Sequence, residues 1–174
     1  MGALRFTKTT VLALCPDNTT GQISPQDLRD VFASMRGGFA HAYTSAGVTA
    51  LAVDATPVEI TTLEHTGPTN GLVLASNNSV VTVDLVGVYL VDFSCYFTGD
   101  VSDTFVFEIA VNGTLSGRKS SVTTTAVVDT ITESSCNALL ELSALDTVSI
   151  FASSTSGGIS ITIKDATFTI KKVA

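Results

Sequence analysis

The stretch that decides the fold is residues 87–97, which read GVYLVDFSCYF. Successive side chains of an extended chain point to opposite sides, so this alternation gives one continuous apolar face. The pattern returns in residues 105–111 and stops at Asn112-Gly113, a strong hairpin signal. Such a chain predicts a rigid β-sandwich whose function lies on its surface and in assembly. The apolar face of the first stretch consists of Tyr89, Val91, Phe93, Cys95 and Phe97.

From residue 39 onward, short apolar segments alternate with turn residues such as Gly67-Pro68 and Asn77-Asn78. Many short strands with regular punctuation are typical of an all-β sandwich or jelly roll. The expected strands are 39–45, 48–53, 57–63, 71–75, 79–85, 87–98, 104–112, 121–132, 137–143, 147–153, 158–164 and 166–173.

The N-terminal 37 residues have a different pattern. An arm with two short apolar segments is followed by one predicted helix, with Ser24 as its N-cap and Pro25 at its first position. An apolar stripe at helical spacing follows, and Gly37 ends the helix. We therefore divide the chain into an arm and helix, 1–37, and a sandwich, 38–174. The stripe consists of Leu28, Val31, Phe32 and Met35.

A helix of about three turns is marginal alone, so its stripe must pack on something. Two roles remain open: the helix plugs one end of its own sandwich, or it connects to a neighbouring subunit or a larger partner. If it is a connector, the attachment residues are those of the stripe together with Leu4, Phe6 and Leu12 of the arm.

Composition excludes several classes of partner. The net charge is −7 with 45% hydrophobic and 14% charged residues, and the few basic residues are scattered, which argues against nucleic-acid binding. No apolar run approaches the length of a membrane span. The stretch before Cys15 is too short for a signal peptide, so we expect neither lipidation nor classical secretion. High apolar content favours an oligomer.

The candidate chemistry is sparse. His41 and His65 lie far apart in the sequence, without a neighbouring ligand at metal-binding spacing, and there is no Gly-x-Ser-x-Gly elbow. The three cysteines lack metal-like spacing. Asp100 and Asp103 offer a calcium site, although paired loop carboxylates are more often solvated. We expect no catalytic residue, no metal, no cofactor and no enzymatic activity.

From residue 71 to residue 173 the chain resembles the C1q/tumour-necrosis-factor-like jelly roll. The matching stretches are GVYLV with Phe93, then 108–113, 140–148 and 161–168. Two glycines that the family commonly has are absent: Leu145 stands where one is usual, and none follows Phe168. The resemblance implies an all-β jelly roll, here preceded by the arm and helix, that assembles as a homotrimer.

A second resemblance covers residues 21–34, GQISPQDLRDVFAS. This segment is similar to one that recurs in structural proteins of tailed bacteriophages, often before a β-rich module. It implies a non-enzymatic virion protein, exposed on the particle surface and assembled in the host cytoplasm. The expected role is a trimeric capsid decoration or head-fibre protein that attaches to other virion proteins through its N-terminal segment.

Other roles remain open. One is a tail-associated receptor-binding tip that contacts a host surface glycan. A spore-surface or cytokine-like trimer and a small carbohydrate-active enzyme are further alternatives.

The predicted trimer interface rests on large apolar residues opposite the core face of their strands, which usually mark a contact. In the resembling fold, strands 87–98 and 147–153 are expected to share the sheet nearest the threefold axis. The predicted interface residues are Leu90, Tyr96 and Phe151.

Overall fold

The structure is a computed structural model that describes residues 37–45, 49–61, 63–100, 102–124, 130–156 and 158–173. The predicted arm and helix lie outside the described residues, and so do all seven predicted attachment residues. The predicted N-terminal unit, residues 1–37, therefore stays a prediction. The part of the chain that starts at Gly38 is one compact unit.

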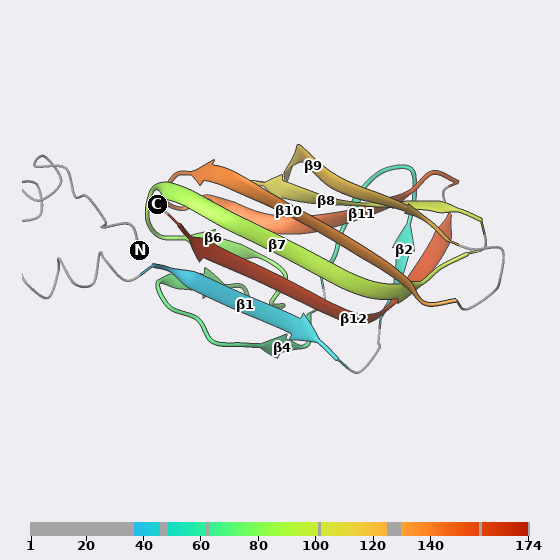
Figure 1. The fold of residues 1–174 in the computed structure, drawn as a ribbon, viewed down its shortest axis with the longest axis horizontal. Coiled ribbons are helices and arrows are strands. Elements are labelled where there is room, and N and C mark those ends of the chain that lie inside the picture. The colour runs from blue at the N-terminus through green and yellow to red at the C-terminus, as the bar shows by residue number, and fades with distance from the viewer. Residues whose placement is uncertain are drawn as a thin grey trace, which may run out of the picture. The chain divides into compact units, whose positions relative to one another are not determined.

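Two six-stranded antiparallel sheets form this unit (Figure 1). Sheet A contains β1 (Phe39–Thr44), β2 (Thr49–Val53), β4 (His65–Thr66), β7 (Gly87–Thr98), β10 (Thr132–Leu142) and β12 (Ile159–Lys172). Sheet B contains β3 (Val58–Glu59), β5 (Leu72–Leu74), β6 (Val81–Val83), β8 (Thr104–Val111), β9 (Thr114–Thr123) and β11 (Thr147–Ser154).

Chain neighbours rarely pair with each other. In sheet A the strands follow the order β10-β7-β12-β1-β4, and β2 pairs with the N-terminal half of β12. In sheet B the order is β5-β6-β11-β8-β9, and β3 pairs with β11. Most connections therefore cross between the two sheets, as expected for a jelly roll. This arrangement confirms the predicted all-β sandwich.

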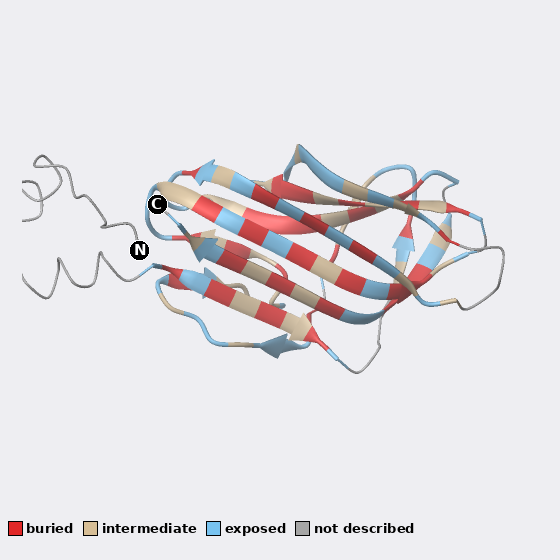
Figure 2. Cartoon of the chain, viewed as in Figure 1, coloured by how far each residue is buried: buried red, intermediate tan, exposed pale blue. Residues whose placement is uncertain are grey.

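The predicted apolar row of β7 fills the core. All five of its side chains are at most 1% exposed, and Figure 2 shows the alternation of buried and exposed positions along the strand. Phe93 and Phe97 contact Phe107 of the opposite sheet at ring-centroid distances of 5.9 and 5.1 Å, and Phe97 meets Phe105 at 5.4 Å. These aromatic contacts join the two sheets.

The predicted turn at Asn112-Gly113 is confirmed. Both residues have positive φ, 52° and 72°, and Val111 pairs with Thr114 across the turn, as in a two-residue hairpin of the primed type. The next strand was expected at 121–132, but the structure has β9 end at Thr123 and β10 begin at Thr132, so the expected bounds are wrong. Strand β9 starts directly after the turn, and its exposed, polar sequence gave no apolar alternation to reveal it.

Two further predicted strands, 158–164 and 166–173, are one strand, β12. Its register against β7 shifts between Ile163 and Asp165. A β-bulge of this kind offsets the alternation by one residue without ending the strand. At its C-terminal end, Lys172 N donates to Gly38 O at 2.7 Å, so the two chain ends of the sandwich lie side by side.

Candidate functional site

The outer face of sheet A is the best candidate for an interaction surface. Register pairs place Leu139, Leu90, Lys171 and Phe39 in one row across β10, β7, β12 and β1. Six residues along β7, Tyr96 lies in a second row. The large apolar side chains remain accessible: Phe39 is 36% exposed, Leu90 39%, Tyr96 47% and Leu139 63%. On a sandwich whose interior is already filled, such a surface indicates a contact with another molecule.

The structure separates the three predicted interface residues. Leu90 and Tyr96 lie on this outer face, and their role in a subunit contact stays a prediction. Phe151 lies in β11, which belongs to sheet B. The expectation that both strands share one sheet is therefore wrong, because sheet membership depends on pairings between strands distant in sequence.

Phe151 occupies a different environment. Its register partners are Glu59 on β3 and Glu108 on β8, and it is half-buried between them. Glu59 Oε1 is buried without a hydrogen-bond partner, and Glu108 accepts a bond from Gly117 N at 2.7 Å. This position packs within sheet B and is not continuous with the surface of sheet A.

Sequence reasoning missed Leu139 and Phe39. Leu139 sits inside an expected strand, and its neighbours Ala138 and Leu140 point inward, so the phase of the alternation could have placed it outward. Its pairing with Leu90 across the strands could not be deduced in this way. Phe39 stands at the first position of β1, where a single residue shows no alternation.

An aromatic cluster lies at the other edge of this face. The ring of Tyr43 on β1 stacks on His41 at 5.6 Å and contacts His65 of β4 at 5.0 Å. His41 Nδ1 bonds Thr169 Oγ1 at 2.9 Å. A Cβ at Gly67 would lie 2.3 Å from His41 Cδ2, so glycine is required there. The pairing of β1 with β4 thus brings together two histidines that lie far apart in the sequence.

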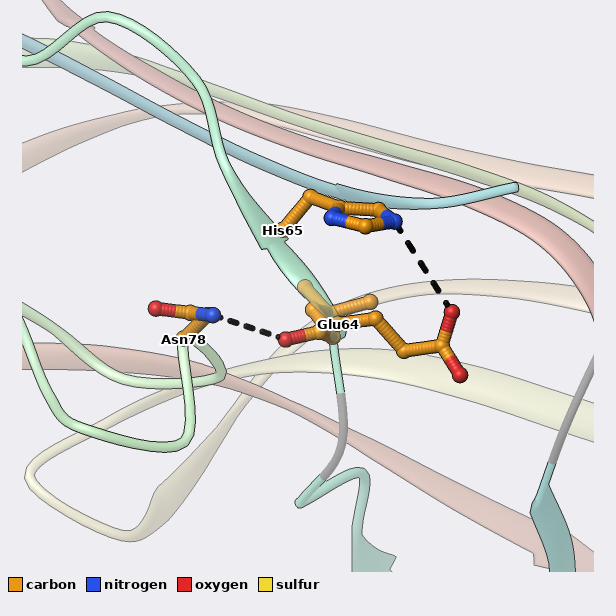
Figure 3. A network of polar contacts seen from close by, with 4 residues as sticks. Glu64, His65 and Asn78 are labelled. Atoms are coloured by element: carbon orange, nitrogen blue, oxygen red, sulfur yellow. Dashed lines mark hydrogen bonds and ion pairs between the residues drawn. The ribbon is translucent and has the colours of Figure 1, made fainter. Parts of the chain in front are cut away.

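His65 faces one carboxylate. Its Nε2 lies 4.0 Å from Glu64 Oε2, as Figure 3 shows, while Asn78 Nδ2 donates to the neighbouring Leu63 carbonyl at 2.9 Å. Within the described ranges, no group of three or more His, Cys, Asp or Glu side chains could hold a metal ion. The described residues also contain no helix long and apolar enough to cross a membrane.

The two described cysteines are poor nucleophiles. Cys95 and Cys136 are buried as free thiols. Burial raises the pKa of Cys136 to about 12 and that of Cys95 further still. Because the thiolate is the reactive form, both side chains act as small core residues.

Asp103 does not behave as a solvated loop carboxylate, because it is only 4% exposed. Thr104 N donates to its Oδ1 at 2.8 Å, Thr155 Oγ1 at 3.0 Å and Ser156 Oγ at 2.7 Å, and Ser154 Oγ donates to its Oδ2. Burial raises its pKa, but these donors together outweigh burial and hold the pKa below its usual value. The Asp103 carboxylate accepts hydrogen bonds from four donors and so stabilises the end of β11. A cation at this position would have to displace these donors.

Comparison with known proteins identifies the fold class. No family model and no curated protein matches the sequence. Among solved structures, the chain is similar to Eiger TNF from S. frugiperda, with 19% identity, a TM-score of 0.57, and coverage of 79% of this chain and 92% of that one. The globular domain of the zebrafish complement 1qA protein matches with 14% identity, a TM-score of 0.55, and coverage of 80% and 98%. The fold is a C1q/TNF-like jelly roll.

Proposed function

We propose that the protein is a non-enzymatic structural protein displayed as a homotrimer on the surface of a phage particle. The observation that carries the assembly part is the accessible apolar row on the outer face of sheet A. Leu139 at 63% exposure and Leu90 at 39% gain free energy from burial against a second copy. A closed ring of identical subunits is a common way to cover such a surface.

The non-enzymatic part is supported by the chemistry of the described side chains. The thiols of Cys95 and Cys136 are buried and protonated. The carboxylate of Asp103 is occupied by hydrogen bonds that hold its own loop. His41 contacts Tyr43 and bonds to Thr169, and His65 contacts the same tyrosine, so both histidines take part in structural contacts.

The particle location is supported by the resemblance of residues 21–34 to a segment of tailed-phage structural proteins. In this proposal the N-terminal segment binds another virion protein. Because Gly38 and Lys172 are adjacent, a tether at this end leaves the loops at the far end of the sandwich free. A projecting trimer multiplies weak contacts through avidity.

Antibody labelling of purified particles tests this function. Density over the capsid lattice supports the decoration role, and density confined to the tail supports the receptor-binding alternative. Absence from the particle contradicts the proposal. In the full chain, Phe32→Asp should abolish particle binding while leaving the sandwich folded, because burying an unpaired carboxylate costs several kcal/mol.

A further inference from the structure

Resting on the proposed trimer, we infer a specific contact between copies: Arg118 of one subunit binds over Tyr96 of the next, between the carboxylates of Glu133 and Asp165. The occupant of this part of sheet A is thus a second copy of the chain. Charge complementarity and the similar positions of the two patches along the strands support this contact.

The receiving patch is an exposed aromatic ring between two acids. Tyr96 is 47% exposed. Its register partners are Glu133 on β10 and Asp165 on β12, and both are exposed on the same face. A tyrosine ring attracts a cation over its face, and carboxylates bind the guanidinium group in fork geometry. The patch therefore fits an arginine side chain.

Among the described residues, Arg118 forms no ion pair with an acidic side chain. Arg118 is exposed on β9, and its backbone N donates to Ser116 Oγ at 3.2 Å. In the part of the chain that the structure describes, the ion pair found is His65–Glu64. Arg118 and the two acids beside Tyr96 thus remain available for a neighbouring subunit.

Arg118 lies where the edges of the two sheets meet. β9 and β10 are edge strands of their sheets, and Ser134 Oγ donates to Ser120 Oγ at 3.1 Å between them. Arg118 lies two residues from Ser120, next to the register shift between Glu108 and Ala110, and its side chain is exposed beside the β10 edge. Lys119 lies on the outer face of sheet B, and its register partner on β8 is Glu108.

The two patches also lie at similar heights along the strands. Ser134 is the register partner of Cys95, the residue before Tyr96. The bond from Ser134 to Ser120 therefore places the Arg118 region within a few residues of the Tyr96 row. Rotation about an axis parallel to the strands keeps each residue at the same position along that axis. The edge that carries Arg118 in one copy can therefore meet the Tyr96 patch of the next copy. A cyclic contact of this kind requires two different, complementary patches, and these two meet the requirement.

Charge reversal in the full-length protein tests the contact, with assembly measured by sedimentation equilibrium. Arg118→Glu should raise the concentration at half-dissociation at least about tenfold, and Asp165→Arg should do the same. The double variant should recover most of the loss, because the pair is restored with opposite signs. Lys119→Glu is the matched control and should leave assembly unchanged. Circular dichroism confirms that each variant is folded.

The outcomes separate this contact from the trimer itself. A trimer that Arg118→Glu weakens no more than Lys119→Glu overturns the contact and leaves the proposed trimer standing, and so does a double variant that recovers nothing. A wild-type chain that stays monomeric overturns both. Raising the salt concentration should weaken wild-type assembly more than that of Arg118→Gln, because exposed ion pairs are screened.

Discussion

The two faces of strand β7 are both apolar at several positions, but among the described residues only the inner face is covered by other side chains. On the inner face, Phe93 and Phe97 are 0% exposed and contact rings of the opposite sheet. On the outer face, Leu90 and Tyr96 remain 39% and 47% exposed. One side of the strand therefore stabilises the fold, and we propose that the other side serves assembly.

The largest expected effect lies on the inner face. Phe93→Ala should lower the free energy of unfolding by about 3–5 kcal/mol, because it removes a buried ring and leaves a cavity. Urea denaturation measures the change. Asp92→Ala, one residue along and on the exposed side, should change the stability by less than about 0.5 kcal/mol. Equal effects from the two substitutions would contradict the assignment of the faces.

Asp103 differs from both faces of β7, because it is a buried charged group held by hydrogen bonds. Asp103→Asn should cost about 1.5–3 kcal/mol, the range for hydrogen bonds to a charged group. Its pKa is lowered in the folded state, so its contribution is present above about pH 4, the usual value for an unfolded aspartate. The contribution is lost as pH falls through the folded pKa. Thermal unfolding measured between pH 7 and pH 2 should therefore show a weaker acid dependence in the variant, and an unchanged profile would contradict this role.

The outer face should affect assembly more than folding. Replacing Leu90 and Leu139 together by serine should raise the dissociation midpoint of the trimer at least about tenfold, or about 1.4 kcal/mol. Far-ultraviolet circular dichroism should stay unchanged, because the core is intact. Val73, 63% exposed on β5 of sheet B, provides the control through Val73→Ser. A trimer that responds equally to both changes would show that the contact is not centred on the Leu90 row.

The smallest expected effect concerns Leu145, which adopts a φ of +73°. The C1q/tumour-necrosis-factor-like family, which the sequence resembles, usually has glycine at this position of the turn. Leu145→Gly relieves about 1–2 kcal/mol of left-handed strain and loses about 0.4–1 kcal/mol through the greater freedom of the unfolded chain. The expected net gain is about 0.5 kcal/mol, measured by urea denaturation. Leu139→Gly, in a regular strand, should be destabilising instead.

Local patterns predicted much of the sandwich. The alternation of residues 87–97 placed every core residue of β7 correctly, and Asn112-Gly113 marked the hairpin. Long-range pairing could not be predicted in this way. The assignment of Phe151 to sheet B depends on its pairing with β8, whose residues lie about forty positions away in the sequence.

The candidate surface was predicted only in part for the same reason. Leu90 and Tyr96 could be placed on the outward face of their strand from alternation alone. The row that joins Leu90 to Leu139, and the contact of Tyr43 with both histidines, arise from sheet order. Likewise, hydroxyl groups from residues 154–156 reach Asp103 only after the strands have paired.

The central claim is that the outer face of sheet A is a contact between copies of this chain. Sedimentation equilibrium of the full-length protein at micromolar concentration tests it most directly. We predict a species with three times the 18.0 kDa mass of the chain, which the Leu90 and Leu139 double variant shifts toward monomer. A stable monomer in the wild-type protein at that concentration would contradict the account.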